Sequence, residues 1–412
     1  MNSPKTGGPN LRRGILILVP FALYPVIDFI FRIANGLIAP DLSAEFSLNA
    51  AQLGLISSVF FIAFGLSQLP LGLALDRFGP RRTTLFLLAT AIAGALLFVR
   101  ADDPADLILG RILLGIGMSA SLIAGIKAAT LWLPGRLPIA TSILVGSTGV
   151  GGMIATVPFA EALAMYSWRD VLLGLTAAVA LLFAVVACLV PGGGGERTGS
   201  IFRQIAGFSP VLRSGGLWRF APIAMAGVGV GSAYQTLWAP LWLRDVAHFT
   251  PSKIAWTMLG MLGVYAVGNF LFGWLAQRLM NQGRSTMSVI LAAFLMFVVC
   301  QIALALQVTE WAVPLWILAS LTLAGAYAIY PVVTGNFPSE FAARASSSLN
   351  FLVFASVFAI QWLIGVIIDG FPNASDGGFA AEAYQWAFAV GIVLQFLAIA
   401  WYFLSRPAGG NS

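Results

Sequence analysis

Hydrophobic residues occur along the chain in long stretches that are separated by short polar segments. Most stretches hold about 20 residues or more, which as a helix is enough to cross a hydrocarbon core of about 30 Å. A chain that repeats this pattern from end to end is predicted to be an all-α integral membrane protein. The expected spans lie near residues 14–39, 50–74, 83–100, 106–132, 138–162, 168–190, 217–242, 252–279, 285–307, 312–336, 346–368 and 383–404.

The expected spans divide into two groups of six. The longest polar interruption, residues 191–216, starts with Pro-Gly-Gly-Gly-Gly and follows the sixth span. We therefore expect a six-helix bundle over residues 1–190, a cytoplasmic linker over 191–216 and a second six-helix bundle over 217–412.

Short sequences recur between the two groups at an offset of about 200 residues. Ala39-Pro40 at the end of the first span is repeated as Ala239-Pro240 near the end of the seventh. Pro134 after the fourth span has a counterpart in Pro338 after the tenth. Internal repeats of this kind are typical of secondary transporters, whose two halves enclose a site near the middle of the membrane.

The composition excludes several classes of protein. Hydrophobic residues make up 59% of the chain and charged residues 9%, whereas soluble proteins carry about 25% charged residues. The net charge of +6 is spread between apolar stretches, so we expect a lipid bilayer and no nucleic acid as partner. No Walker A sequence, metal-ligand cluster or catalytic constellation is found. We expect a monomer that is not an enzyme, has no cofactor and draws its energy from a proton gradient.

The distribution of lysine and arginine predicts the orientation. If the amino terminus is cytoplasmic, fifteen of the 22 basic residues fall in cytoplasmic segments and four in external ones. Positive charge accumulates on the cytoplasmic side of membrane proteins. Both termini are therefore predicted to be cytoplasmic, with the chain crossing the inner membrane many times.

The most polar short segment reads Gly72-Leu-Ala-Leu-Asp76-Arg77-Phe-Gly79-Pro-Arg81-Arg82. It resembles the G-x-L-x-D-R-x-G-R-[RK] loop of the major facilitator superfamily, although a proline precedes the arginine pair here. In that family the loop joins helices 2 and 3 on the cytoplasmic side, where the charge distribution also places it.

Four further segments resemble motifs of the same family in the corresponding places. They are Arg111-Ile-Leu-Leu-Gly-Ile-Gly117, the glycine-rich stretch 146–152 followed by Pro158, Ser167-Trp168-Arg169, and Pro338-Ser-Glu-Phe-Ala-Ala-Arg344. The resemblance implies the fold of the family: 12 transmembrane helices in two pseudo-symmetric six-helix bundles around a central cavity. It also implies a gating role for the segment that contains Gly72 and Gly79.

For this segment the resemblance implies that Asp76 and Arg77 latch the two halves together on the cytoplasmic side. Charged groups avoid hydrocarbon, so the carboxylate belongs at the interface, where guanidinium groups and helix amino termini surround it. Arg81 could join the gate or could only anchor the topology. We also assign a gating role to Arg111, for which a structural role near the external mouth is the alternative.

Charged residues inside the expected spans are the first candidates for a functional site, because they are costly in a membrane. Asp28 and Arg32 lie four residues apart on the first helix, hence within pairing reach. We predict that Arg32 binds an anionic group and that Asp28 couples transport to protons, unless the two form a structural pair. Lys127 is a second candidate for substrate binding, or it extends toward the cytoplasmic interface. Glu161 is a weaker candidate for proton coupling.

Polar and aromatic residues at membrane depth complete the predicted site, although any single aromatic residue could serve helix packing. Those assigned to substrate binding are Tyr24, Tyr234, Gln235, Trp238, Asn269, Tyr327, Asn350 and Gln361. Together with the excess of positive charge, they predict a small organic solute that is anionic or zwitterionic. The expected function is secondary active transport by proton-coupled symport. The alternatives are a proton-coupled efflux antiporter for amphipathic compounds and a membrane receptor that does not transport.

Overall fold

The computed structural model describes residues 11–193, 208–372, 374 and 378–405, and within these ranges it contains helices and no strand. The first half of the chain contains α1 (Leu11–Phe46), α2 (Ala50–Val99), α3 (Pro104–Met118), α4 (Ile123–Trp132), η1 (Pro134–Arg136), α5 (Leu137–Ile154), α6 (Val157–Met165) and α7 (Trp168–Leu189). The second half contains α9 (Ser209–Leu212), α10 (Gly215–Trp218), α11 (Ala221–Ala233), η2 (Tyr234–Trp238), α12 (Ala239–Asp245), α13 (Pro251–Asn281), α14 (Met287–Ala305), η3 (Thr309–Trp311), α15 (Ala312–Ala326), α16 (Ile329–Gly335), α17 (Ser339–Asp369) and α18 (Ala381–Leu404).

Ten helical stretches among the described residues are long and apolar enough to cross a membrane. The difference from the twelve expected spans has two sources. Helix α2 covers the second and third expected spans, joined by a kink at Gly79, whose φ of 76° and ψ of 165° are not helical. A positive φ is accessible to glycine at little cost because it has no Cβ. The seventh expected span is divided into α11, η2 and α12.

Several expected spans are interrupted near their middle. The fourth breaks between α3 and α4 at residues 119–122, the fifth before Val157, the seventh at the π-helical η2, and the tenth at residues 327–328. Discontinuous helices and π-helical turns are frequent at functional sites of membrane proteins, because they free backbone and side-chain polar groups near the midplane. These interruptions therefore indicate the part of the molecule in which to look for a functional site.

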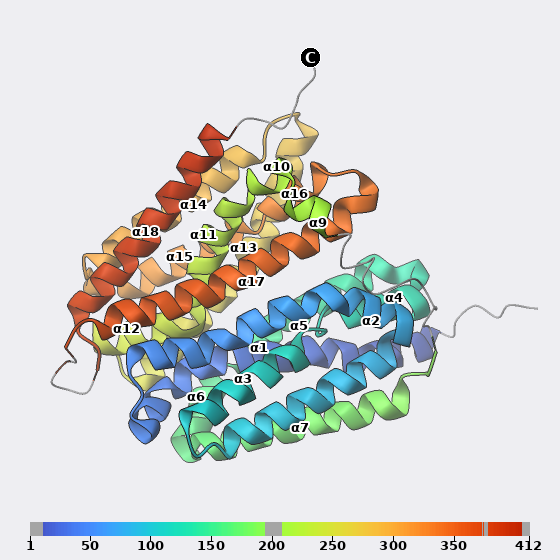
Figure 1. Cartoon of the computed structure of the whole chain (residues 1–412), viewed down its shortest axis with the longest axis horizontal. Coiled ribbons are helices and arrows are strands. Elements are labelled where there is room, and N and C mark those ends of the chain that lie inside the picture. Colours follow the sequence, from blue (N-terminus) through green and yellow to red (C-terminus); the bar gives the residue numbers. More distant parts are fainter. Residues whose placement is uncertain (1–10, 194–207, 373, 375–377, 406–412) are drawn as a thin grey trace, which may run out of the picture.

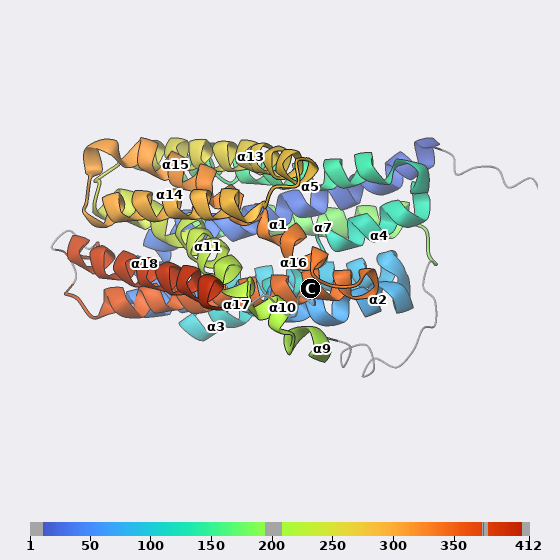
Figure 2. The same ribbon diagram turned by 90° about the horizontal axis from the view of Figure 1, so that it is seen from above.

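The helices form two bundles that lie side by side. Helices α1 to α7 pack against one another, and α11 to α18 do the same. In Figure 1 the first bundle, blue to green, lies below the second, yellow to red, and both run along the long axis (Figure 2). The predicted linker lies largely outside the described residues, apart from residues 191–193 and 208–216. The division into domains at residues 190 and 217 stays a prediction.

The two bundles touch along α2 and α17, along α1 with η2 and α12, and along α13 with α5 and α6. Glycines allow the closest of these contacts. A Cβ added to Gly36 of α1 would lie 2.6 Å from the carbonyl oxygen of Thr236, and one added to Gly365 of α17 would lie 2.4 Å from that of Ala50. Both contacts lie toward the end that carries the α1–α2 turn, which we call the closed end.

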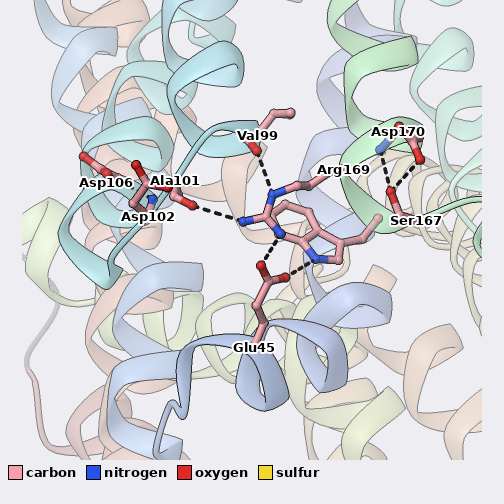
Figure 3. Close-up of polar contacts among 9 residues, drawn as sticks. Glu45, Val99, Ala101, Asp102, Asp106, Ser167, Arg169 and Asp170 are labelled. Atoms are coloured by element: carbon pink, nitrogen blue, oxygen red, sulfur yellow. Dashed lines mark hydrogen bonds and ion pairs between the residues drawn. The ribbon is translucent and has the colours of Figure 1, made fainter.

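A carboxylate ties the helices of each bundle together at the closed end. In the first bundle, Glu45 accepts a hydrogen bond of 2.9 Å from Nε1 of Trp168 and pairs with Arg169. The Arg169 guanidinium also donates to the carbonyl oxygens of Val99 and Ala101, each at 3.0 Å (Figure 3). The ends of α1 and α2 are thereby joined to the start of α7.

The second bundle has an equivalent carboxylate in Asp245 at the end of α12. Its side chain is 2% exposed. It accepts hydrogen bonds from the Tyr384 hydroxyl at 2.6 Å and from the Phe379 backbone N–H at 3.2 Å, and it pairs with Arg244. The end of α12 is thereby joined to the start of α18.

Candidate functional site

An ion pair lies at the middle of α1. The Arg32 guanidinium donates from Nε to Oδ1 of Asp28 at 2.9 Å and from Nη2 to Oδ2 at 2.7 Å. The four-residue spacing places both side chains on one face of the helix, and the planar guanidinium matches the carboxylate in a two-point contact. Asp28 is buried, with 3% of its surface exposed. The pair that the spacing predicted is therefore present, and its role stays a prediction.

The interruption between α3 and α4 supplies a third member of this group. The Ser121 hydroxyl, which lies in the break, donates to Oδ2 of Asp28 at 2.7 Å. The Asp28 carboxylate thus accepts three hydrogen bonds, which satisfy much of its capacity as an acceptor.

Aromatic rings from both bundles surround the Arg32 guanidinium. Its carbon Cζ lies 4.3 Å from the ring centroid of Phe64, 5.4 Å from that of Phe354 and 5.9 Å from that of Phe60. Cations within about 6 Å of a ring centroid are attracted to the ring face. Because Phe354 belongs to α17, Arg32 lies at the boundary between the bundles. Gly65 permits this contact, since a Cβ there would lie 2.9 Å from Cβ of Phe354.

A cluster of phenols and amides lies nearby in the second bundle. Asn350 is four residues before Phe354 on α17, hence one turn away on the same face. Its Oδ1 accepts a hydrogen bond of 3.1 Å from the Tyr330 hydroxyl. The Tyr330 ring stacks on Tyr327 at a centroid distance of 6.0 Å, and Tyr327 meets Tyr265 of α13 edge to face at 5.9 Å.

A cavity of about 600 Å³ adjoins this cluster between α13, α15 and α16. Asn269 and Tyr327, both predicted to bind substrate, line it. The remaining wall mixes apolar residues with Gln277, Ser285, Thr286 and Asn336. Cavities of roughly 300–1,000 Å³ with a few polar groups are typical of small-molecule sites.

The other predicted substrate-binding residues lie in tightly packed surroundings. Tyr234 is buried against Phe388 and donates to Oε1 of Gln301 at 3.2 Å. Trp238 donates from Nε1 to the Gln361 carbonyl oxygen at 3.1 Å, and both side chains are fully buried.

Two more of these residues, one from each bundle, are also buried. Tyr24 donates its hydroxyl to the carbonyl oxygen of Gly117 within the first bundle. Gln235 lies in the π-helical η2 and is 6% exposed. For all these buried residues, the predicted role in binding remains a prediction.

The polar segment around the Gly79 kink forms contacts that its motif did not anticipate. Nζ of Lys127 lies 2.7 Å from Oδ1 of Asp76, with side-chain exposures of 32% and 48%. Lys127, predicted to bind substrate, therefore lies beside the predicted gate, because α4 brings it to the level of the kink. Arg81 donates to the Ala187 carbonyl oxygen of α7, and Arg77 is exposed beside Phe78.

Two remaining candidates lie at the surface and one is buried. Gly72 is exposed, and a Cβ there would have no described atom within 4 Å. Glu161 is exposed on α6. Arg111 is 2% exposed between α1, α2 and α3 and binds backbone carbonyl oxygens.

Sequence reasoning missed several residues of the site. Phe64, Phe354 and Tyr265 occur in apolar stretches rich in aromatic residues, where single rings carry no distinguishing signal. Ser121 could have been found together with its neighbour Ser119, because two small polar residues so close together mark a break in an apolar helix. Among the described residues, no group of three or more His, Cys, Asp or Glu side chains could hold a metal ion.

Comparison with known proteins agrees with this architecture. The family model described as Major Facilitator Superfamily matches residues 21–360. A gallate transporter of Pseudomonas putida is 25% identical over 395 residues, which cover 85% of this chain and 82% of the relative. A nitrate/nitrite transporter of Picosynechococcus sp. is 26% identical over 245 residues, covering 59% of this chain and 40% of the relative.

Several of the sequence matches cover only part of each relative, whereas a match to a solved structure covers nearly the whole of both chains. In the first curated relatives, the chain spans between 33% and 40% of the relative's own length. A crystal structure of a bacterial homolog of the human lysosomal transporter Spinster, inward-facing and unoccupied, matches with a TM-score of 0.78 and 18% identity. The match covers 98% of both chains and shows the fold alone.

Proposed function

The chain belongs to the Major Facilitator Superfamily, and on that premise we propose that it is a secondary transporter for a small organic anion, driven by proton symport. Alternating access of the site between the two bundles would carry the solute across the membrane. The observation that carries this proposal is the ion pair between buried Asp28 and partly buried Arg32 at the middle of α1, next to Phe354 of the other bundle.

Charge balance at this pair explains how proton and anion would be coupled. With the site empty, the Asp28 carboxylate neutralises Arg32. A proton that binds Asp28 removes this counter-charge, and the anionic group of the solute then takes its place on the guanidinium. Both states are neutral, whereas loading the proton or the anion alone leaves a buried charge uncompensated, which costs several kcal/mol in a protein interior. The site therefore favours loading one proton with each negative charge.

The second bundle supports a more specific solute class. Asn350 lies one helical turn, roughly 6 Å, from Phe354, whose ring contacts Arg32, and it accepts a hydrogen bond from the Tyr330 hydroxyl. A solute whose carboxylate binds Arg32 would place its other end against phenol and amide groups that donate and accept hydrogen bonds. A small hydroxylated carboxylate fits both ends, and the relative from Pseudomonas putida is named for gallate, a solute of this class.

The membrane placement is part of the same proposal. With both termini cytoplasmic, the closed end faces the periplasm and the Gly79 kink faces the cytoplasm. The described conformation would then admit solute from the cytoplasmic side. The chain would act as a monomer in the inner membrane.

Transport by the purified protein in proteoliposomes tests the proposal. A panel of hydroxylated carboxylates, with gallate and a uronic acid among them, is first screened for ligands that raise the melting temperature, since a ligand that binds the folded state stabilises it. Counterflow of the radiolabelled hit and its accumulation under an inward proton gradient are then measured. If no stabilising carboxylate shows counterflow, the transporter proposal is wrong. If the proton gradient drives the solute outward instead, the protein is an efflux antiporter.

Two variants separate binding from coupling. Arg32→Gln removes the anion-binding group, and we expect at least tenfold weaker binding with loss of both counterflow and accumulation. Asp28→Asn keeps the size of the side chain but cannot release a proton, so accumulation should be lost while counterflow remains. Arg100→Gln, at an exposed position at the end of α2, is the control. Equal loss of counterflow and accumulation in Asp28→Asn would make Asp28 a structural residue.

A further inference from the structure

Arg111 connects three helices of the first bundle. From α3 it donates through Nη1 to the Phe31 carbonyl oxygen of α1 at 3.0 Å and through Nη2 to the Ser57 carbonyl oxygen of α2 at 3.3 Å. Its guanidinium carbon lies 4.8 Å from the ring centroid of Phe60. The side chain is 2% exposed, so its third nitrogen cannot be hydrated from the surface.

That third nitrogen and one amide oxygen have no partner among the described residues. They are Nε of Arg111 and Oδ1 of Asn35, and both atoms are inaccessible to solvent. Asn35 is itself 2% exposed, and its Nδ2 donates to the hydroxyl of Ser57. A buried donor or acceptor without a partner costs about 1–3 kcal/mol, so two such atoms in one place call for a ligand.

A small cavity lies between these two residues. Its volume is about 10 Å³, and Arg111 and Asn35 are the polar members of its lining. Apolar side chains form the rest, with Phe31, Phe98 and Leu114 among them. This volume is close to the lower limit for one water molecule, and it is far too small for an organic solute.

We propose that this cavity is a binding site for a single internal water molecule. The water accepts a hydrogen bond from the Arg111 Nε–H and donates one to Oδ1 of Asn35. Water has both a lone pair and a proton to offer, whereas a halide matches the donor and is repelled by the amide oxygen. A metal cation matches the oxygen and is repelled by the guanidinium.

The water would complete a closed ring of hydrogen bonds. In this ring Arg111 donates through Nη2 to the Ser57 carbonyl oxygen, Asn35 donates through Nδ2 to the Ser57 hydroxyl, and the water links Oδ1 of Asn35 back to Nε of Arg111. It joins α1, α2 and α3 beside the predicted site, because the Phe31 carbonyl oxygen that Arg111 binds belongs to the peptide that precedes Arg32. The water thereby helps to hold the part of α1 that carries the anion-binding group, and its presence does not depend on whether the protein transports an anion.

Radiolytic hydroxyl-radical labelling of the full-length protein in detergent, read by mass spectrometry, tests the site. Water bound in the cavity generates radicals next to Phe98, which is 3% exposed. We expect Phe98 to be labelled at least tenfold faster than Phe388, a ring in the second bundle that is 0% exposed. Equal, slow labelling of the two rings in the wild-type protein would refute the proposal.

Two variants and a bromide soak test whether the labelling of Phe98 comes from water in this cavity. Asn35→Leu replaces the acceptor by an apolar side chain of similar size, and labelling of Phe98 should fall to the level of Phe388. Gln68→Leu, which removes a buried amide from α2 instead of α1, should leave the labelling of Phe98 unchanged. If Asn35→Leu does not fold, the wild-type comparison decides. Crystals soaked in bromide provide an independent check, because an anomalous peak in the cavity would show a halide in place of water.

Discussion

Gly36 is the position at which a single methyl group should separate the two bundles. The Cβ of an alanine there would lie 2.6 Å from the Thr236 carbonyl oxygen and 3.1 Å from Cγ of Pro240. A carbon and an oxygen in contact lie about 3.3 Å apart or more, so the two backbones must move apart by roughly 0.7 Å. The obstacle is a backbone atom, which cannot rotate away as a side chain could.

The free-energy cost of Gly36→Ala to the closed state can be estimated from the cost of overpacking. Forcing extra carbon into a tight contact costs about 1–3 kcal/mol. Because the contact exists only while the closed end is closed, Gly36→Ala should penalise that state and leave a separated state untouched. The population ratio of separated to closed molecules should then rise by a factor of about 5–150.

A cysteine introduced at the same junction can report whether the two bundles have separated there. Leu241 is 1% exposed and lines a crevice of about 320 Å³ between the bundles at the closed end. In a variant with Leu241→Cys and the two native cysteines replaced, Gly36→Ala should speed labelling by a membrane-impermeant maleimide at least fivefold. Gly149→Ala is the matched control, since a Cβ there has no described atom within 4 Å. An unchanged rate in folded Gly36→Ala protein would show that this contact does not hold the closed end together.

Further predictions concern the ionic contacts away from the site. Asp245→Asn should lower the melting temperature of the protein more than Glu45→Gln does, because the Asp245 carboxylate is almost wholly buried and the Glu45 side chain is 40% exposed. Equal shifts in melting temperature would contradict this reasoning. The partly exposed pair of Asp76 and Lys127 should contribute about 0–1 kcal/mol to stability in a double-mutant cycle. A coupling above 2 kcal/mol in that cycle would indicate a buried, structural pair instead.

The features that could be predicted from the sequence are those set by residues close together along the chain. The Asp28–Arg32 pair is present because a spacing of four residues places two side chains on one face of any helix, whatever packs around it. The kink at Gly79 falls within the polar segment that the family resemblance assigned to the turn between two spans. The apolar stretches became helices because a membrane leaves the backbone few other ways to satisfy its hydrogen bonds.

The sequence could not predict contacts that depend on how helices are rotated and set against one another. Phe354 is more than 300 residues from Arg32, and its contact with that side chain rests on the register of α17 against α2. The pairing of Lys127 with Asp76 has the same origin, since it depends on the depth of α4 relative to the kink. Apolar periodicity is weak in helices that are hydrophobic on all sides, so the pattern of residues did not indicate which face of α17 meets α2.

The two carboxylates at the closed end bear on the history of the chain. Glu45 and Asp245 stand 200 residues apart, the same offset at which other segments of the two halves repeat. Each binds the start of the last helix of its own bundle and pairs with an arginine, yet Glu45 is also held by the indole of Trp168 and Asp245 by a tyrosine and a backbone N–H. This is what an ancestral duplication leaves behind when the position of an acid is inherited and its partners diverge. A chimera that joins two copies of one half would therefore keep both of its ties, whereas exchanging only the last helix of each half would break them.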